Sequence, residues 1–138
     1  MTVADCRQID FPEIRDPRGS LTFIEALRHV PFEIKRVYFI HGVPGHAIRA
    51  GHAHKALQQI LLAIAGSFQV LLDDGTHKKL VVLDRCDYGL YIGPGVWREL
   101  KQFSPGAICL ALVSDYFDES DYYRDYDRFL QATGGHRH

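Results

Sequence analysis

Two histidines, His52 and His54, stand two residues apart in the stretch RAGHAHK at residues 49–55. Alternate residues of a strand project to the same face of a sheet. If this stretch is extended, as its flanks suggest, both imidazoles point into one space. Because imidazoles titrate near neutral pH, such a pair is suited to form half of a metal site or to transfer protons.

The residues that follow favour proton transfer over metal binding. The spacing from His54 through Gln59 to Gly66 resembles the first motif of cupins, small β-barrels in which two histidines, a carboxylate and a later histidine bind a divalent metal. Gln59 takes the place of the carboxylate, and a neutral amide is a poorer ligand for a divalent cation. At the expected fourth ligand stand Arg98 and Glu99, and a guanidinium cannot coordinate a cation. We therefore expect no metal and no other cofactor.

Length and composition indicate one small domain that positions these side chains. The 138 residues, 46% of them hydrophobic, suffice for one core but not for two ordinary domains. A formal net charge of −1 supplies no field for non-specific binding to nucleic acid or membrane. The three cysteines are odd in number and widely spaced, the N-terminus lacks the features of a signal peptide, and no apolar run approaches membrane-spanning length. These features predict a cytoplasmic protein.

Short apolar or alternating runs predict strands through most of the chain. They are separated by turn signals rich in Pro, Gly and Asp, at residues 16–19, 43–45, 73–75 and 104–106. The predicted strands cover residues 20–25, 35–41, 57–65, 68–72, 79–83, 89–92, 97–102 and 108–113. Strands at this spacing without intervening helices favour an all-β sandwich or barrel. Tyr122, Tyr126 and Phe129 recur at helical spacing and predict one short C-terminal helix over residues 121–131. We predict a single domain over residues 1–132 and a disordered tail over 133–138.

Four segments together resemble the sugar-nucleotide 3,4-ketoisomerases, across about residues 16–129. The segments are IKRVY at 34–38, HAHK at 52–55, GLYIGP at 89–94 leading to Trp97, and SDYFDESDY at 114–122. The resemblance implies a cupin-like (jelly-roll) β-barrel that forms a homodimer by exchanging N-terminal strands. It also implies conversion of dTDP-4-keto-6-deoxy-D-glucose to a 3-keto isomer. An aminotransferase then turns that isomer into a 3-amino-3,6-dideoxy sugar for surface polysaccharide, such as lipopolysaccharide, or for natural-product glycosides.

Moving a carbonyl from C4 to C3 needs a base, a proton carrier and donors that stabilise an oxyanion, but no redox cofactor. By carry-over from the family's first motif, His52 is the base that works on C3 and C4. His54 then relays protons between the two oxygens. Arg98 is the candidate for stabilising the enediolate, because it is a permanent cation in an enclosed pocket. Gln59 is predicted to hydrogen-bond near the histidines and fix their tautomers.

The remaining predicted contacts bind the sugar nucleotide. Arg36 and Arg49 are interpreted as pyrophosphate ligands, because guanidinium groups match phosphate oxygens bidentately. Lys55 is a further candidate. Tyr38 is predicted to donate a hydrogen bond to the sugar, and Trp97 to form a wall of the pocket.

Arg18 and Arg98 bear on the stereochemistry of the product. The first position varies in the family between Arg and Tyr, and the second between His and Arg. The resemblance implies that the two places control which face of C4 is protonated, giving a galacto or a gluco product. Because this chain has arginine at both places, it matches neither pairing, and the stereochemistry stays open.

Three alternative functions stay open on the sequence. A 3,5-epimerase of the same nucleotide sugar is also a metal-free, cupin-like barrel. It would require a His paired with an Asp and a tyrosine as general acid, rather than a His-Ala-His pair. A metal-dependent cupin oxygenase or isomerase is disfavoured by Gln59 and Arg98. A non-catalytic sugar-binding barrel is disfavoured because His52 and His54 are both intact.

Overall fold

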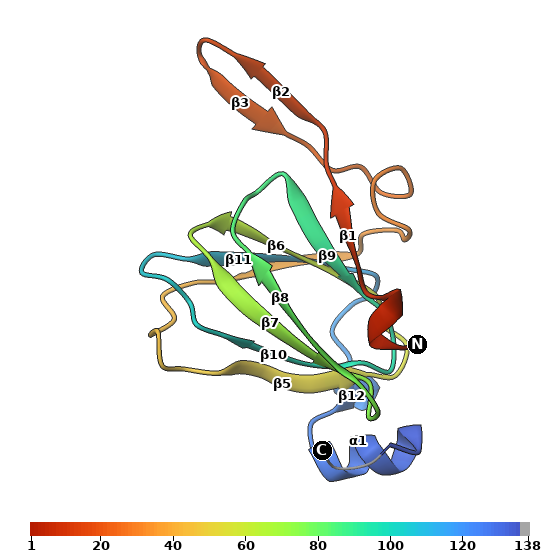
Figure 1. Ribbon diagram of the computed structural model, residues 1–138. Coiled ribbons are helices and arrows are strands. Elements are labelled where there is room, and N and C mark those ends of the chain that lie inside the picture. Colours follow the sequence, from red (N-terminus) through yellow and green to blue (C-terminus); the bar gives the residue numbers. More distant parts are fainter. Residues whose placement is uncertain (136–138) are drawn as a thin grey trace.

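Two antiparallel β-sheets form most of the molecule in the computed structural model, which describes residues 1–135 (Figure 1). One sheet has the strand order β1-β9-β6-β11-β4 and the other the order β12-β5-β10-β7-β8. The strands are β1 Arg7–Asp10, β2 Glu13–Asp16, β3 Gly19–Thr22, β4 Arg36–Ile40, β5 Arg49–His54, β6 Gln59–Ala65, β7 Phe68–Asp73, β8 Lys78–Leu83, β9 Tyr88–Ile92, β10 Trp97–Lys101, β11 Ile108–Val113 and β12 Tyr122–Tyr123. The helical segments are η1 Val3–Asp5, η2 Glu119–Asp121 and α1 Tyr126–Thr133. The predicted all-β barrel with a short C-terminal helix is confirmed.

Each of the eight predicted strands overlaps an observed one, and the predicted extension of the histidine stretch is confirmed as β5. The strands β1 and β2 were not predicted. Their residues are mostly exposed or half-buried, so they lack the apolar alternation that marks a half-buried strand.

The central strand β6 is buried on both faces, which explains its unbroken apolar run. Leu61 faces the core between the two sheets. Ile60 and Leu62 face the other way, into a second cluster that Val30 and Phe32 of the loop before β4 help to cover. Burial of each large apolar side chain contributes about 1.5–3 kcal/mol, so these two layers hold β6 firmly in place.

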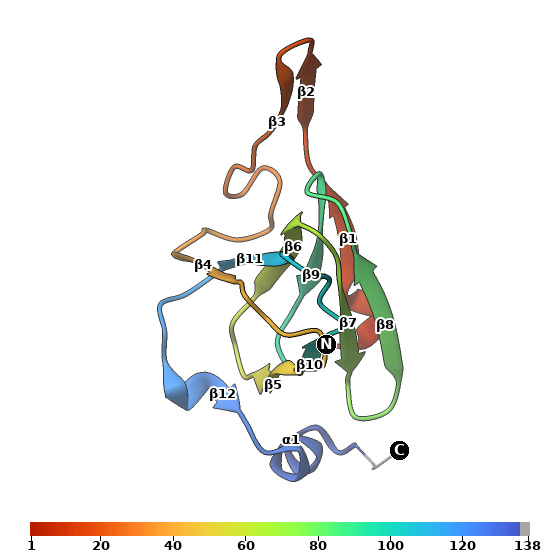
Figure 2. The ribbon, with the colours of Figure 1, turned by 90° about the vertical axis from the view of Figure 1, so that its left-hand side faces the viewer.

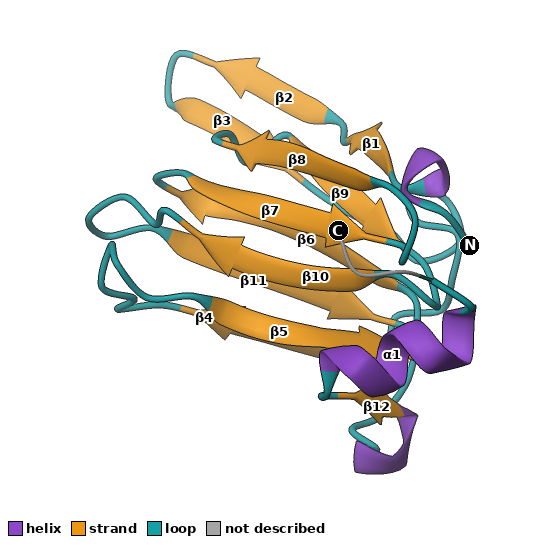
Figure 3. Ribbon diagram, turned by 60° about the horizontal axis from the view of Figure 1, so that its bottom comes forward, coloured by secondary structure: helices purple, strands orange, loops and turns teal. Residues whose placement is uncertain are grey.

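The helix α1 covers the outer face of the second sheet (Figure 3). Phe129 and Leu130 are buried there against Ala53 and Trp97. The side chain of Asp125 begins the helix by accepting a hydrogen bond from the backbone N–H of Arg128, 3.1 Å away.

The predicted first residue of the C-terminal helix was wrong, because the helix begins at Tyr126 and not at residue 121. Asp121 ends η2, and Tyr122 lies in β12, where it pairs with His54. Pairing with the free edge of β5 therefore overrides the helical spacing of the tyrosines. The helix runs on to Thr133 and ends at Gly134 in the left-handed conformation, so the predicted domain boundary at residue 132 falls inside its last turn. Residues 136–138 of the predicted tail lie outside the described residues.

The hairpin β2–β3 projects away from the two-sheet barrel (Figures 1 and 2). Ile14 and Leu21 face each other across it, with 57% and 56% of their surfaces exposed. A single chain therefore leaves this apolar pair uncovered. Within the described residues, every helix is too short or too polar to span a bilayer.

Candidate active site

The strand β5 carries a bulge next to its histidines. Arg98 of β10 pairs with His52 and Leu100 pairs with Arg49, so two residues of β5 lie opposite one of β10. The two backbone φ angles in the bulge, at Ala50 and Gly51, are positive. The bulge directs the carbonyl oxygen of Ala50 toward the ring of His52.

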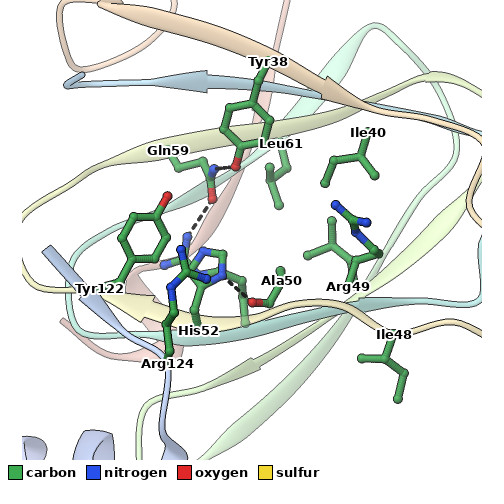
Figure 4. Close-up of a pocket in the computed structure, with 12 residues that line it drawn as sticks. Tyr38, Ile40, Ile48, Arg49, Ala50, His52, Gln59, Leu61, Tyr122 and Arg124 are labelled. Atoms are coloured by element: carbon green, nitrogen blue, oxygen red, sulfur yellow. Dashed lines mark hydrogen bonds between the residues drawn. The ribbon is translucent and has the colours of Figure 1, made fainter. Parts of the chain in front are cut away.

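His52 is held as a neutral base. Its Nδ1 donates a short hydrogen bond to the carbonyl oxygen of Ala50, which can only accept (Figure 4). Burial, and then the neighbouring cation of Arg98, lower the pKa of His52 from 6.5 to about 4. At neutral pH the ring therefore has its one proton on Nδ1 and a lone pair on Nε2. That nitrogen is buried, with no hydrogen-bond partner among the described residues.

Arg98 lies directly across the strand pair from His52, with 1% of its surface exposed. One terminal nitrogen donates to Oε1 of Gln59 at 2.6 Å, and the other donates to the carbonyl oxygen of Val96 at 2.9 Å. Burial lowers the pKa of Arg98 to about 10, which leaves it protonated at neutral pH. Both of these hydrogen-bond acceptors are neutral, and no carboxylate of the described residues lies within ion-pair distance of the Arg98 guanidinium. This uncompensated charge favours an anion developing beside His52.

Gln59 links the two sheets through this network. Its amide nitrogen donates to the hydroxyl of Tyr38 at 2.6 Å, while its oxygen accepts from Arg98. The hydroxyl hydrogen of Tyr38 is therefore available to another acceptor in the cavity. The prediction that Gln59 fixes the tautomers of the histidines was wrong, because it hydrogen-bonds to Arg98 and Tyr38 instead.

His54 lies beside His52, with ring centroids 4.8 Å apart. Its Nδ1 lies 3.0 Å from Oδ2 of Asp121, and the ring of Tyr122 lies 4.4 Å away. Burial, and then the charge of Arg98, lower the pKa of His54 to about 2, so this ring is also neutral. The intervening Ala53 belongs to the apolar cluster under α1. The expected projection of both imidazoles to one face is thus observed.

A cavity of about 390 Å³ opens beside these groups (Figure 4). This volume is within the usual range for small-molecule sites. Its lining residues are Tyr38, Ile40, Ile48, Arg49, Ala50, His52, Gln59, Leu61, Arg98, Leu100, Tyr122 and Arg124. The three guanidinium groups suit an anionic ligand, and the aliphatic residues suit an apolar surface of it.

The prediction that Trp97 forms a wall of the pocket was wrong. Neighbouring strand residues face opposite sides, so Trp97 must face away when Arg98 faces the cavity. Trp97 packs under α1, with its ring 5.3 Å from that of Tyr126 and 5.7 Å from that of Phe129. Its role here is in the core.

The cavity lining also lacks His54, Arg36, Lys55 and Arg18. The buried ring of His54 contacts the lining residues His52 and Tyr122. The guanidinium of Arg36 lies 5.4 Å from the ring of Tyr38, and the amine of Lys55 lies 5.2 Å from the ring of Tyr123. Arg18 is on the projecting hairpin, where it forms an exposed ion pair with Asp16. Within one chain, Arg18 is therefore not brought to the site.

Three residues of the site were missed by the sequence analysis: Asp121, Tyr122 and Arg124. The guanidinium of Arg124 lies 4.1 Å from the ring of Tyr122 and forms an ion pair with Glu119. All three lie in or beside the motif at residues 114–122, whose end overlaps the predicted helix over residues 121–131. Reading that motif as an extended segment paired with the histidine strand would have found them.

Metal ligands are not gathered in this cavity. No group of three or more His, Cys, Asp or Glu side chains in residues 1–135 is arranged to hold a metal ion. The positions next to the histidines are taken by an amide and a guanidinium, and neither is a good donor to a divalent cation.

Comparisons with known proteins cover nearly the whole chain. The family model described as FdtA: WxcM-like, C-terminal matches residues 4–134. A TDP-4-oxo-6-deoxy-alpha-D-glucose-3,4-oxoisomerase from Aneurinibacillus thermoaerophilus is 48% identical over 121 residues, which is 88% of this chain and 87% of that protein. The crystal structure of a 3,4-ketoisomerase from Helicobacter canadensis has a TM-score of 0.92 and 43% identity, covering 94% of this chain and 98% of that one. A mutant of the 3,4-ketoisomerase QdtA from Thermoanaerobacterium thermosaccharolyticum, crystallised with TDP-4-keto-6-deoxyglucose, has a TM-score of 0.92 and 40% identity, covering 94% of each chain.

Proposed function

Because this chain belongs to the FdtA (WxcM-like, C-terminal) family, we propose that it is a TDP-4-keto-6-deoxyhexose 3,4-ketoisomerase that works through an enediol or enediolate. The observation that carries this mechanism is the buried Nε2 of His52, which is unprotonated at neutral pH and lies beside the cation of Arg98. A base and an electrostatic stabiliser side by side are what the abstraction of a proton next to a carbonyl requires.

The first step breaks the C3–H bond of the sugar. Nε2 of His52 takes the proton, the C–H electron pair forms a C3–C4 double bond, and the carbonyl pair moves onto the oxygen at C4. The positive charge of Arg98 and the hydroxyl hydrogen of Tyr38 stabilise this oxygen. His54 carries the hydroxyl proton of C3 to the oxygen at C4, and His52 returns its proton to C4. The carbonyl then stands at C3, and no electron is gained or lost.

Arg49 and Arg124 line the same cavity and suit the diphosphate of the nucleotide, since guanidinium groups match phosphate oxygens. The 3-keto product has the carbonyl that an aminotransferase needs to make a 3-amino-3,6-dideoxy sugar. Isomerisation therefore precedes amino transfer in this proposal.

We also propose that the active form is a homodimer with exchanged N-terminal strands. The support is the projecting β2–β3 hairpin, whose Ile14 and Leu21 have no cover in a single chain. A second subunit that covers them would also receive the exposed Arg18 at the tip of the hairpin. Light scattering that finds a fully active monomer at micromolar concentration would contradict this assembly.

The function is tested by incubating the protein with TDP-4-keto-6-deoxyglucose in deuterated water and following the sugar by NMR. A 3,4-ketoisomerase gives a product with its carbonyl at C3, and C4 gains deuterium to the extent that the proton held by His52 exchanges with the solvent before it returns to the sugar. His52→Asn should abolish both isomerisation and exchange and leave the affinity for TDP nearly unchanged, because the nucleotide is held elsewhere. Near-normal turnover in this variant would remove His52 from the mechanism.

The 3,5-epimerase alternative has one observation in its favour. His54 is paired with Asp121 and touches Tyr122, so a His–Asp pair with a tyrosine is present alongside the His-Ala-His pair. These residues therefore do not separate the two activities. The position of the deuterium does, because an epimerase would label C3 and C5 and leave the carbonyl at C4.

A further inference from the structure

The segment around Asp121 is fixed against the end of β5 by several hydrogen bonds. Asp118 accepts from the backbone N–H of Ser120 at 3.0 Å and from its hydroxyl at 2.7 Å. The carbonyl oxygen of Asp121 accepts from the backbone N–H of Lys55 at 2.8 Å. In addition, β12 pairs with β5 directly after Asp121. The side chain of Asp121 is therefore held at a set place beside His54.

The carboxylate of Asp121 accepts two hydrogen bonds, one on each oxygen. Oδ2 lies 3.0 Å from Nδ1 of His54, and Oδ1 accepts from the backbone N–H of Ala56 at 2.8 Å. An ionised carboxylate can only accept, so the hydrogen of the first bond must be on Nδ1. Because His54 is neutral, its Nε2 then has the lone pair.

We infer that Asp121 is a positioning residue that fixes His54 in the tautomer needed for proton relay. This inference rests on the proposed ketoisomerase function. A relay that begins by accepting the hydroxyl proton of C3 needs an unprotonated nitrogen, and the contact with Asp121 keeps Nε2 in that state. The negative charge of Asp121 also stabilises the imidazolium that exists while His54 holds the extra proton.

The partner of each histidine differs in charge, and this suits the two roles. His52 donates to the neutral carbonyl of Ala50, whereas His54 donates to a carboxylate. Both rings have the same tautomer, but only His54 has an anionic partner for its protonated form. Asp121 therefore distinguishes the relay from the carbon base.

The substitution Asp121→Asn tests this inference with almost no change of shape. The N–H of Ala56 can only donate, so the amide must place its oxygen there. Its NH₂ group then faces Nδ1 of His54, which must accept, and the ring proton moves to Nε2. The opposite orientation of the amide leaves its NH₂ facing the N–H of Ala56, two donors without an acceptor.

The tautomers are read by NMR of isotopically labelled histidine ring nitrogens. We expect the proton of His54 on Nδ1 in the wild type and on Nε2 in Asp121→Asn. We expect the proton of His52 to stay on Nδ1 in both, which serves as an internal reference. The matched control is Asp115→Asn, which removes an exposed carboxylate charge from the same stretch of chain, where Asp115 accepts from the backbone N–H of Tyr116 and touches neither histidine. The kcat of Asp121→Asn should fall by about 10²-fold, with KM within about threefold, whereas the control should keep both.

The outcomes separate this inference from the function on which it rests. A proton on Nε2 of His54 in the wild type, or on Nδ1 in Asp121→Asn, overturns the inference even if the protein is an active ketoisomerase. A shifted tautomer with unchanged kcat overturns the role in turnover. A wild type without isomerase activity refutes the proposed function and leaves the tautomer result standing. If Asp121→Asn does not fold, Asp121→Ala is measured in the same way, and a His54 ring still held wholly in the Nδ1–H form contradicts the inference.

Discussion

Replacing Arg98 by methionine is expected to separate the stability of this cavity from its catalysis. Burial lowers the pKa of Arg98 from 12.5 to about 10. Between these values the unfolded state binds more protons than the folded state, so the free energy of unfolding rises with pH in that window. At neutral pH the protonated folded form therefore bears the full penalty, on the order of 3 kcal/mol.

Removal of the guanidinium relieves that penalty and also has a cost. Oε1 of Gln59 loses the donor that lies 2.6 Å away, and an unsatisfied buried acceptor costs about 1–3 kcal/mol. Methionine fills much of the space with an apolar side chain. The two effects nearly cancel, so we expect the free energy of unfolding of Arg98→Met to stay within about 2 kcal/mol of the wild type.

Activity should respond quite differently. Loss of one preorganised donor to an oxyanion costs about 2.7–4 kcal/mol of transition-state stabilisation, or about 10²–10³ in kcat. Urea denaturation and the NMR turnover assay measure the two quantities on the same sample. Arg85→Met is the matched control, because Arg85 is exposed and paired with Asp87 outside the cavity. A loss of more than about 4 kcal/mol in stability with unchanged kcat would refute the reasoning.

Three further predictions concern pH, metal and product. The value of kcat/KM should hold through slightly acidic pH and fall as pH drops through about 4, because His52 must be unprotonated. The free energy of unfolding should decrease as the pH falls from 6.5 to about 4, because the histidine binds its proton in the unfolded state at a higher pH than in the folded state. A pH–rate profile in which activity is lost around pH 6.5 would contradict the assignment of His52 as the base. Exhaustive chelation should leave activity intact in the turnover assay. Activity that is lost to the chelator and restored by one particular divalent ion would contradict the metal-free proton-transfer mechanism. Arg98→His should change the ratio of gluco to galacto product or lower the rate, and Arg18→Tyr should act in the same way if the hairpin of a partner subunit reaches the site. A difference of about 1.4 kcal/mol between the two protonation transition states changes that ratio tenfold. If NMR shows the wild-type product at the wild-type rate in both variants, these arginines do not control which face of C4 is protonated.

Much of the barrel follows from local patterns in the sequence. Strands such as β6 and β11 are recognisable because burial demands apolar residues along them. The exposed strands β1 and β2 are not, because their pairing leaves little trace in side-chain polarity. The helix was misplaced because the tyrosine spacing is compatible with a helix, whereas the pairing of Tyr122 with His54 depends on a distant strand.

The candidate site was predictable where one strand supplies neighbouring groups. His52 and His54 follow from a period of two along β5. The same period allows only one of Trp97 and Arg98 to face the cavity, so the prediction that both face it was wrong. Asp121 lies 67 residues from His54, so their contact could not be inferred from spacing and required the folded chain.

The hydrogen bond between Arg98 and Gln59 also limits how this cavity can change its chemistry by mutation. Gln59→Glu alone places a carboxylate against the guanidinium and forms an ion pair, so the new oxygen ligands are already occupied. Arg98→His alone supplies a third imidazole but leaves the weak amide ligand. A metal-binding descendant therefore lies two substitutions away: the change at Gln59 supplies the oxygen ligand, and the change at Arg98 removes the cation that would repel the metal.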